Sequence, residues 1–221
     1  MARVVNHAIV LAIAVGAASC VGAGEGTISG TLNVPVCELS GAWNLEPSFY
    51  AANHEGSTMW IRIQHGGGEP EYTDGLWVTI DDTNAVASLL QASPARDAQG
   101  NPIVTLPVGM RGDPGVIIHA TLTLDWSCGR HKVTRLGENV GLWAYQGTMT
   151  FSAIDNPQDG VDSTNGRLTD VTAFQFRVHD PRPVGPNAPH NVPQDAPVGD
   201  GDISGSFSFH YSRQIPAQFF P

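Results

Sequence analysis

Residues Val116–Cys128, with the sequence VIIHATLTLDWSC, decide the fold class of this chain. Every even position in the segment is apolar or a cysteine, and every odd position from His119 onward is polar. This two-residue period is that of a β-strand, in which successive side chains point to opposite faces of a sheet. A helix would scatter the even positions around its circumference. The segment therefore predicts a long strand with one face in a core and the other in water.

Several other segments show the same alternation, and stretches rich in glycine, proline and aspartate separate them. They predict an all-β fold, an antiparallel β-sandwich of about eight strands forming one domain over residues 27–221. A closed barrel is the alternative, which the uneven strand lengths disfavour. A short segment, Asn84–Leu90, fits either a helix or a strand. The other expected strands are Thr27–Val34, Thr58–His65, Gly75–Asp81, Ile103–Leu106, Leu142–Ile154, Leu168–Val178 and Asp202–Ser212.

The C-terminal half of the chain adds three local expectations. In Leu142–Ile154 the odd positions carry the bulkier side chains and are expected to face the core. In Leu168–Val178 the apolar parity shifts at Ala173–Phe174, which indicates a β-bulge. Residues His179–Gly201 contain six prolines and no periodicity. A segment of this kind predicts a long Pro-rich loop outside the core.

The N-terminus has the pattern of an export signal. Arg3 precedes a short apolar run, Ala8–Ala18, which is too short to span a bilayer because that takes about 20 residues. A charged start, a short apolar core and small residues before a junction predict a secretory signal over residues 1–19 that is removed. Residues 20–26 are small and predict a flexible tether.

The small residues directly before Cys20 resemble the lipobox of bacterial lipoproteins, in which the cysteine is acylated and becomes the first residue. The family prefers an aliphatic residue such as leucine where this chain has Ala17. The resemblance implies a lipid anchor on Cys20. Because Val21 rather than aspartate follows, it also implies release toward the outer membrane. The alternative is ordinary signal cleavage, which would leave Cys20 as a free thiol.

The mature chain also resembles a group of uncharacterised Gram-negative lipoproteins. The shared features are the lipobox cysteine, an IRIQ strand at Ile61–Gln64, a DGL turn at Asp74–Leu76 and an aromatic C-terminus ending in Phe220-Pro221. The resemblance implies an outer-membrane lipoprotein of the cell envelope, with the domain on either the periplasmic or the surface side. It carries no known activity and no site residues.

The cysteine count agrees with a lipid anchor. Three cysteines are an awkward number for an exported protein, but acylation of Cys20 leaves an even pair, Cys37 and Cys128. In an oxidising compartment this pair is expected to form a disulfide. The two residues are 91 positions apart, so closing the loop is worth roughly 4–5 kcal/mol in the chain-entropy model. Two separate buried thiols are the alternative.

Charge and motifs exclude several classes of function. The net charge is −10 and the only lysine is Lys132, so the chain lacks a basic patch for nucleic acid or anionic headgroups. No GxSxG motif occurs, and Thr58 stands where an HExxH motif beginning at His54 needs its second histidine. The sequence therefore predicts a protein without catalysis or a cofactor. An enzyme such as a glycosidase, working with two carboxylates, is the remaining alternative.

Two groups of residues have side chains of the types that bind metal ions. Four oxygen-bearing residues between positions 155 and 165 lie in one glycine-containing loop, which suits calcium. Their spacing does not match an EF-hand, and such residues are also what turns consist of. Three histidines near the Pro-rich loop lack a fixed ligand spacing, so the sequence predicts no metal site. The two groups are Asp155, Asp159, Asp162 and Asn165, and His179, His190 and His210.

The strongest candidate for ligand binding is a pair of tryptophans in the expected hairpin of Thr58–His65 and Gly75–Asp81. Trp60 and Trp77 alternate with apolar residues and so fall on the face away from the core. An antiparallel register would set Trp77 opposite Arg62 and Trp60 opposite Thr79. An exposed cation–π contact of Arg62 with an indole is worth about 0.5–1 kcal/mol. Such a platform suits a sugar ring, whereas tryptophans are more often packed beneath a covering segment.

These observations predict a lipid-anchored cell-envelope protein whose β-sandwich has a structural or protein-interaction role. The expected partners are the membrane, through the N-terminal lipid, and an envelope protein or polysaccharide. The alternative is a carbohydrate-binding module that uses Trp60, Arg62 and Trp77.

Overall fold

The computed structural model describes residues 24–66, 73–128, 140–155, 167–180 and 199–211, and every structural statement below refers to these. They form one sheet of ten strands, in the order β2-β1-β10-β9-β8-β6-β7-β5-β4-β3, and one α-helix. The all-β prediction is confirmed. The elements are β1 (Gly24–Val34), a 3-10 turn η1 (Pro35–Cys37), β2 (Leu39–Leu45), β3 (Phe49–Glu55), β4 (Thr58–Gln64), β5 (Gly75–Ile80), α1 (Thr83–Ala92), β6 (Val104–Val108), β7 (Ile118–Thr123), β8 (Gly141–Ala153), β9 (Arg167–His179) and β10 (Asp200–Tyr211).

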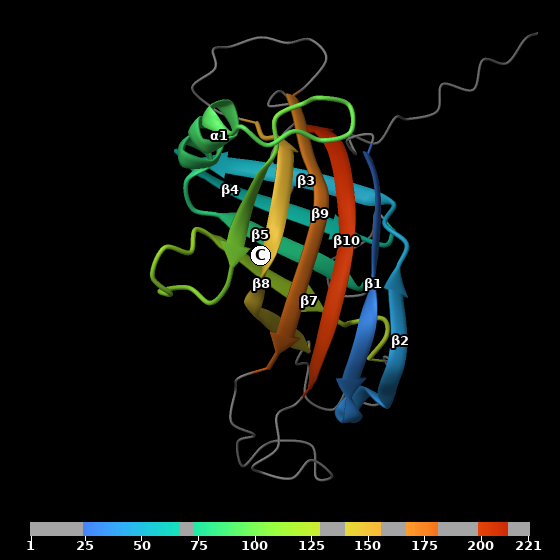
Figure 1. Ribbon diagram of the computed structural model, residues 1–221. Helices are drawn as coiled ribbons and strands as arrows, with labels where there is room; N and C mark the ends of the chain where they lie inside the picture. Colours follow the sequence, from blue (N-terminus) through green and yellow to red (C-terminus); the bar gives the residue numbers. More distant parts are fainter. Residues whose placement is uncertain (1–23, 67–72, 129–139, 156–166, 181–198, 212–221) are drawn as a thin grey trace, which may run out of the picture.

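The strands belong to one bent sheet and not to two separate ones. Neighbouring strands are antiparallel, apart from a short parallel contact between β6 and β7. The sheet bends at β8, which pairs with β9 on one side and with both β6 and β7 on the other. In Figure 1, β1, β2, β9 and β10 run nearly vertically in front of β3, β4, β5 and β7, which cross behind them. The eight strands of the predicted sandwich are thus ten, and β2 and β3 are the two without an expected counterpart.

The bend encloses a single core between the two ends of the sheet. The ring of Tyr50 on β3 stacks against that of Phe209 on β10, with centroids 6.1 Å apart. Phe174, Phe176 and Phe207 continue this aromatic group, and all are buried. Because β3 and β10 are distant in sheet order but touch across the core, both arms of the sheet share one hydrophobic interior.

The strand expected at Val116–Cys128 is shorter than predicted. Its apolar even positions are buried from Ile118 to Leu124, but β7 ends at Thr123 and Trp126 is 70% exposed. The backbone N–H groups of Trp126 and Ser127 donate to the carboxylate of Asp74 instead of pairing with a neighbouring strand. The chain therefore turns after Leu124, and the prediction that Trp126 lies on the buried face is wrong.

Register irregularities shape β8 and β9. The bulge predicted in β9 is confirmed, because Thr172 and Ala173 are both exposed between buried neighbours and the pairing with β10 shifts there. In β8 the pairing with β9 slips between Ala144 and Gln146. The predicted odd-numbered core face of β8 is consequently correct only from Met149 onward.

The segment between β5 and β6 forms a helix. Asp82 is its N-cap, and the Asp82 carboxylate accepts a hydrogen bond from the backbone N–H of Ala85 at 3.1 Å. Such a cap satisfies one of the free N–H groups of the first turn. Val86 and Leu90 are buried on the inner side of α1. The helical alternative for Asn84–Leu90 is thus the one observed.

The loop after α1 is closed by the carboxylate of Asp97. The side-chain amide of Asn101 donates to it at 2.9 Å, and the backbone N–H groups of Asn101 and Gln99 donate at 2.8 and 2.9 Å. These hydrogen bonds, that from the Asn101 side chain first, hold the pKa of Asp97 below its ordinary value. A lowered pKa means that the folded loop favours the ionised carboxylate.

The stabilisation that Asp97 gives is therefore complete above the unfolded pKa of about 3.9 and is lost as the pH falls through the lower folded pKa. An NMR titration of the Asp97 side-chain carboxyl carbon should give a midpoint below that of aspartate in an unfolded peptide. Asn101→Ala should move this midpoint upward. A midpoint at or above the peptide value in the unaltered chain would contradict the assignment.

The predicted signal at residues 1–19 and most of the Pro-rich loop, residues 181–198, lie outside the described residues. The expected tether at 20–26 overlaps β1, which already begins at Gly24. The only α-helix described, α1, falls short of the length and apolar character that a membrane crossing requires.

Candidate ligand-binding site

Cys37 and Cys128 form a disulfide, as predicted. Their Cα atoms lie 4.3 Å apart, and both side chains are buried. The bridge joins η1, between β1 and β2, to the turn that follows β7. It thus fixes the end of a turn, residues 125–128, to the segment between β1 and β2.

The same turn is held from its other side by Asp74, which directly precedes β5. One carboxylate oxygen of Asp74 accepts the backbone N–H groups of Trp126 and Ser127, both at 2.9 Å. The other oxygen accepts the hydroxyl of Ser127. The Ser127 hydroxyl oxygen in turn accepts the indole N–H of Trp43 on β2 at 3.2 Å. Asp74 is only 5% exposed, so this network belongs to the framework of the turn and not to its surface.

The rigid turn displays the indole of Trp126 to solvent. Among the described residues, the large hydrophobic side chains that are exposed are those of Trp126, Leu89 and Leu168. Trp126 is the aromatic one of these three, and at 70% it is also the most exposed. A tryptophan in this setting contributes little to the core.

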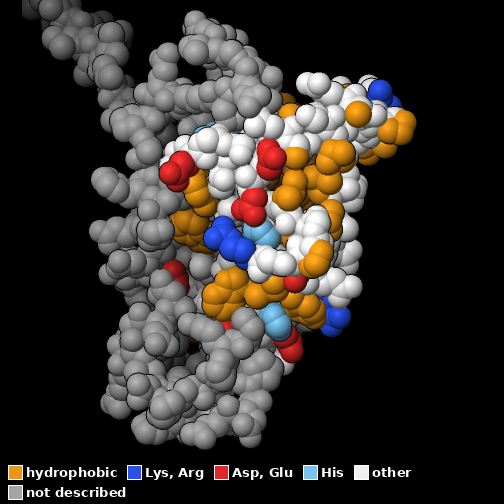
Figure 2. Space-filling view, turned by 90° about the vertical axis from the view of Figure 1, so that its left-hand side faces the viewer, with side chains coloured by type: hydrophobic (Ala, Val, Ile, Leu, Met, Phe, Trp, Pro, Cys, Tyr) orange, Lys and Arg blue, Asp and Glu red, His pale blue; other side chains and the backbone are white. Residues whose placement is uncertain are grey.

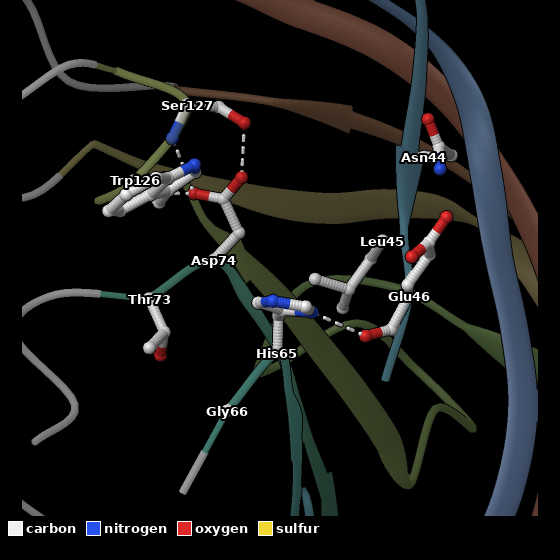
Figure 3. A pocket seen from close by; sticks show the side chains of 9 residues that line it. All are labelled: Asn44, Leu45, Glu46, His65, Gly66, Thr73, Asp74, Trp126 and Ser127. Carbon is white, nitrogen blue, oxygen red and sulfur yellow. Dashed lines mark hydrogen bonds between the residues drawn. The ribbon is translucent and has the colours of Figure 1, made fainter. Parts of the chain in front are cut away.

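The indole stands beside a pocket with a volume of about 540 Å³. Figure 3 shows Trp126 and Asp74 on one side, the β2 side of the pocket opposite, and His65 between them. The Nδ1 atom of His65 lies 2.8 Å from the backbone carbonyl oxygen of Glu46. The pocket is lined by Asn44, Leu45, Glu46, His65, Gly66, Thr73, Asp74, Trp126 and Ser127.

The charge of the lining is negative. Glu46 and Asp74 are its carboxylates, and neither lysine nor arginine is among the described residues that line it. The Asp74 carboxylate already accepts hydrogen bonds from Trp126 and Ser127 in the turn. The side chains of Glu46 and Asn44, in contrast, are exposed. Among the described residues, no hydrogen bond or ion pair engages the Glu46 carboxylate or the Asn44 amide. The pocket thus combines one flat aromatic face with free polar groups opposite.

The predicted group of Trp60, Arg62 and Trp77 lies on the outer face of β4 and β5. The predicted register is confirmed, since Arg62 pairs with Trp77 and Trp60 with Thr79. The Arg62 guanidinium lies 4.9 Å from the centroid of the Trp77 ring and 5.5 Å from that of Phe49. Arg62 is only 5% exposed, and this burial lowers the pKa of its guanidinium. Trp60 and Trp77 are half-buried.

A second polar group ties the loop before β7 to the end of β5. The Nε2 atom of His119 lies 3.1 Å from the Asp81 carboxylate, and its Nδ1 atom lies 2.9 Å from the carbonyl oxygen of Gly109. The guanidinium of Arg111 approaches the same carboxylate at 3.8 Å. Figure 2 shows a face of the molecule on which acidic, basic and histidine side chains lie together between groups of hydrophobic ones. Because its atoms are engaged with one another, this group is a connection between loops.

The residues considered for metal binding are only partly described. Asp155 is buried at the end of β8, with its carboxylate 3.1 Å from Nε2 of His54. The ring of His179 packs against Tyr145 with centroids 4.4 Å apart, and His210 is exposed on β10. In the described part of the chain, no three His, Cys, Asp or Glu side chains are grouped so as to hold a metal ion. Asp159, Asp162, Asn165 and His190 lie outside the described residues.

Sequence reasoning missed the pocket at Trp126. Asn44 and Glu46 belong to β2 or its end, which was not predicted, and Trp126 was assigned to a buried face. The alternation continues through Cys128, so the sequence carries no local signal of the turn. Comparison of the chain with protein-family models, with curated proteins and with solved structures gives no match in any of the three.

Proposed function

We infer that this chain is a lipid-anchored protein of the bacterial cell envelope whose β domain is a non-catalytic interaction module. The observation that carries this proposal is the bridge between Cys37 and Cys128. It accounts for two of the three cysteines and leaves Cys20, directly after Ala17-Ala18-Ser19, for acylation. Disulfides persist in oxidising compartments such as the bacterial periplasm and the cell surface, which supports an envelope location.

The domain suits a scaffold role. Its bent sheet, in which two crossing arms enclose one core, would present its outer faces and loops much as a β-sandwich does. We expect an envelope protein or a polysaccharide as its partner, with the N-terminal lipid holding the domain at the outer membrane. The tether proposed between lipid and domain ends before β1, at residue 23.

The anchor can be tested by the intact mass of the protein extracted from membranes of a Gram-negative host under non-reducing conditions. The expected product begins at Cys20, carries a diacyl- or triacylglyceryl group and lacks two hydrogens because of the disulfide. Cys20→Ser is the matched control, which should lose the lipid and keep the bridge. A product cut at another position, without lipid, would contradict the proposal.

A carbohydrate-binding module is the second candidate function. It is favoured by an exposed tryptophan, Trp126, next to a pocket with free polar side chains. The platform of Trp60, Arg62 and Trp77 that the sequence predicts remains a proposal for the same function. Because Arg62 is buried, this platform is the less favoured of the two sugar-binding sites. The two positions are separated by the experiment below.

A further inference from the structure

We propose that the pocket beside Trp126 binds a neutral oligosaccharide, with one pyranose ring stacked on the indole. This inference rests on the second candidate function, carbohydrate binding, and is independent of the lipid anchor. It names a site, Trp126 with Glu46, Asn44 and His65, that differs from the group of Trp60, Arg62 and Trp77.

The first argument is that the indole is exposed and yet preorganised. Leaving a large apolar side chain in water gives up the stabilisation that its burial would provide. The backbone of the turn is nevertheless held, because the N–H groups of Trp126 and Ser127 each donate to Asp74 and the disulfide of Cys128 follows two residues after Trp126. Fixing a binding group before the ligand arrives lowers the entropy cost of association. A flat apolar surface displayed on a backbone that is already held in place is what the C–H face of a sugar ring requires.

The second argument is the polar chemistry opposite the indole. The partner of His65 Nδ1 is the backbone carbonyl oxygen of Glu46, which can only accept a hydrogen bond, so Nδ1 is the donor. In a neutral imidazole with the proton on Nδ1, Nε2 is an acceptor. The Glu46 carboxylate accepts hydrogen bonds, and the Asn44 amide both donates and accepts. Adjacent sugar hydroxyls, each of which donates and accepts, match this mixture. A pocket of about 540 Å³ also lies in the range of small-molecule sites.

The third argument is charge, which selects among sugars. An anionic ligand such as a uronic acid or a phosphorylated sugar would face the Glu46 carboxylate, and the described lining holds neither lysine nor arginine to offset the repulsion. A purely apolar ligand would leave the Glu46 and Asn44 groups desolvated and unpaired, which is costly. A neutral oligosaccharide avoids both costs.

The test is isothermal titration of the purified, oxidised protein with a panel of neutral trisaccharides: cellotriose, maltotriose, mannotriose and triacetylchitotriose. Trigalacturonate is the anionic counterpart, and choline tests whether the indole and Glu46 bind a cation instead. NMR signals of the indole N–H groups report which tryptophan is perturbed. Trp126→Ala should weaken binding of the preferred neutral sugar by at least about tenfold. Glu46→Gln should weaken it as well.

Leu89→Ala is the matched control, because Leu89 is also exposed, at 46%, but lies on α1 and does not line the pocket. It should leave the affinity unchanged, and unchanged thermal unfolding of Trp126→Ala would show that the domain is intact. Binding that is lost in Trp60→Ala or Trp77→Ala but kept in Trp126→Ala would overturn the site while leaving carbohydrate binding in place. Saturable binding of choline or trigalacturonate alone, or no binding to any neutral sugar at millimolar concentration, would overturn the proposal altogether.

Discussion

Replacing Cys37 and Cys128 together by serine should lower the free energy of unfolding by roughly 4–5 kcal/mol. The bridge closes a loop of 91 residues in sequence, so its removal releases a large part of the chain in the unfolded state. Typical domains have a total stability of only about 5–15 kcal/mol, and the variant should therefore unfold at much lower denaturant concentration. Urea unfolding followed by circular dichroism measures the difference.

The matched control is the single substitution Cys20→Ser in the otherwise unaltered chain. It removes a cysteine outside the described fold and keeps the bridge between Cys37 and Cys128. It should leave the unfolding midpoint of the domain unchanged. Adding a reductant to the unaltered chain should reproduce the double-serine result, and it should have no effect on the double-serine variant. If the bridged and unbridged forms were equally stable, the bridge would not restrict the unfolded chain any further than the chain is restricted without it. This result would contradict the prediction.

The pairing of β4 with β5 could be predicted from the sequence because the two strands follow each other closely and alternation fixes which of their residues share a face. A one-residue slip would move Ile61 and Val78 from the core to the outside, so burial requires Arg62 and Trp77 to share the outer face. The bulge in β9 was predictable for the same reason, since a parity change is visible in the residues themselves. These features depend on local pattern and one buried face.

The bend of the sheet could not be predicted in this way. A two-sheet sandwich and a single bent sheet both bury one face of every strand, so the alternation is the same in each. What distinguishes the single bent sheet is that one edge of β8 pairs with two strands, with β7 near Leu142 and with β6 near Met149. Between these two pairings, at Ala144, the register of β8 with β9 on its other edge shifts. The strand β2 was missed because it carries few β-branched residues and contains Gly41 at a φ of +119°.

The end of β7 shows why the candidate site escaped prediction. The alternation continues through Trp126, but its backbone N–H is taken by the carboxylate of Asp74, 52 residues earlier. Whether this N–H pairs with a neighbouring strand or with a side chain far away in the sequence cannot be recognised from the residues around Trp126. The pocket draws on β2, the region between β4 and β5, and the turn after β7, and these meet only in the folded chain.

Asp74→Ala should destabilise the domain by roughly 3–4 kcal/mol, because three donors lose a charged and buried acceptor at once. The donors are the N–H groups of Trp126 and Ser127 and the Ser127 hydroxyl. Asp74→Asn should cost clearly less, since the amide oxygen can still accept both backbone N–H groups. Urea unfolding of the two variants against the unaltered chain measures this order.

Asp97→Ala provides the matched control for Asp74, because Asp97 also accepts three hydrogen bonds from a turn but is far more exposed. Water can replace the lost acceptor there, so its effect on unfolding should be much smaller. Asp74→Ala should in addition broaden or shift the NMR signal of the Trp126 indole, because the hydrogen-bond network no longer holds the turn that carries it. The same substitution should weaken sugar binding, although it removes no contact with the sugar. Equal effects of Asp74→Ala and Asp97→Ala on unfolding would mean that burial of the acceptor is irrelevant. The turn would then be held by the disulfide alone.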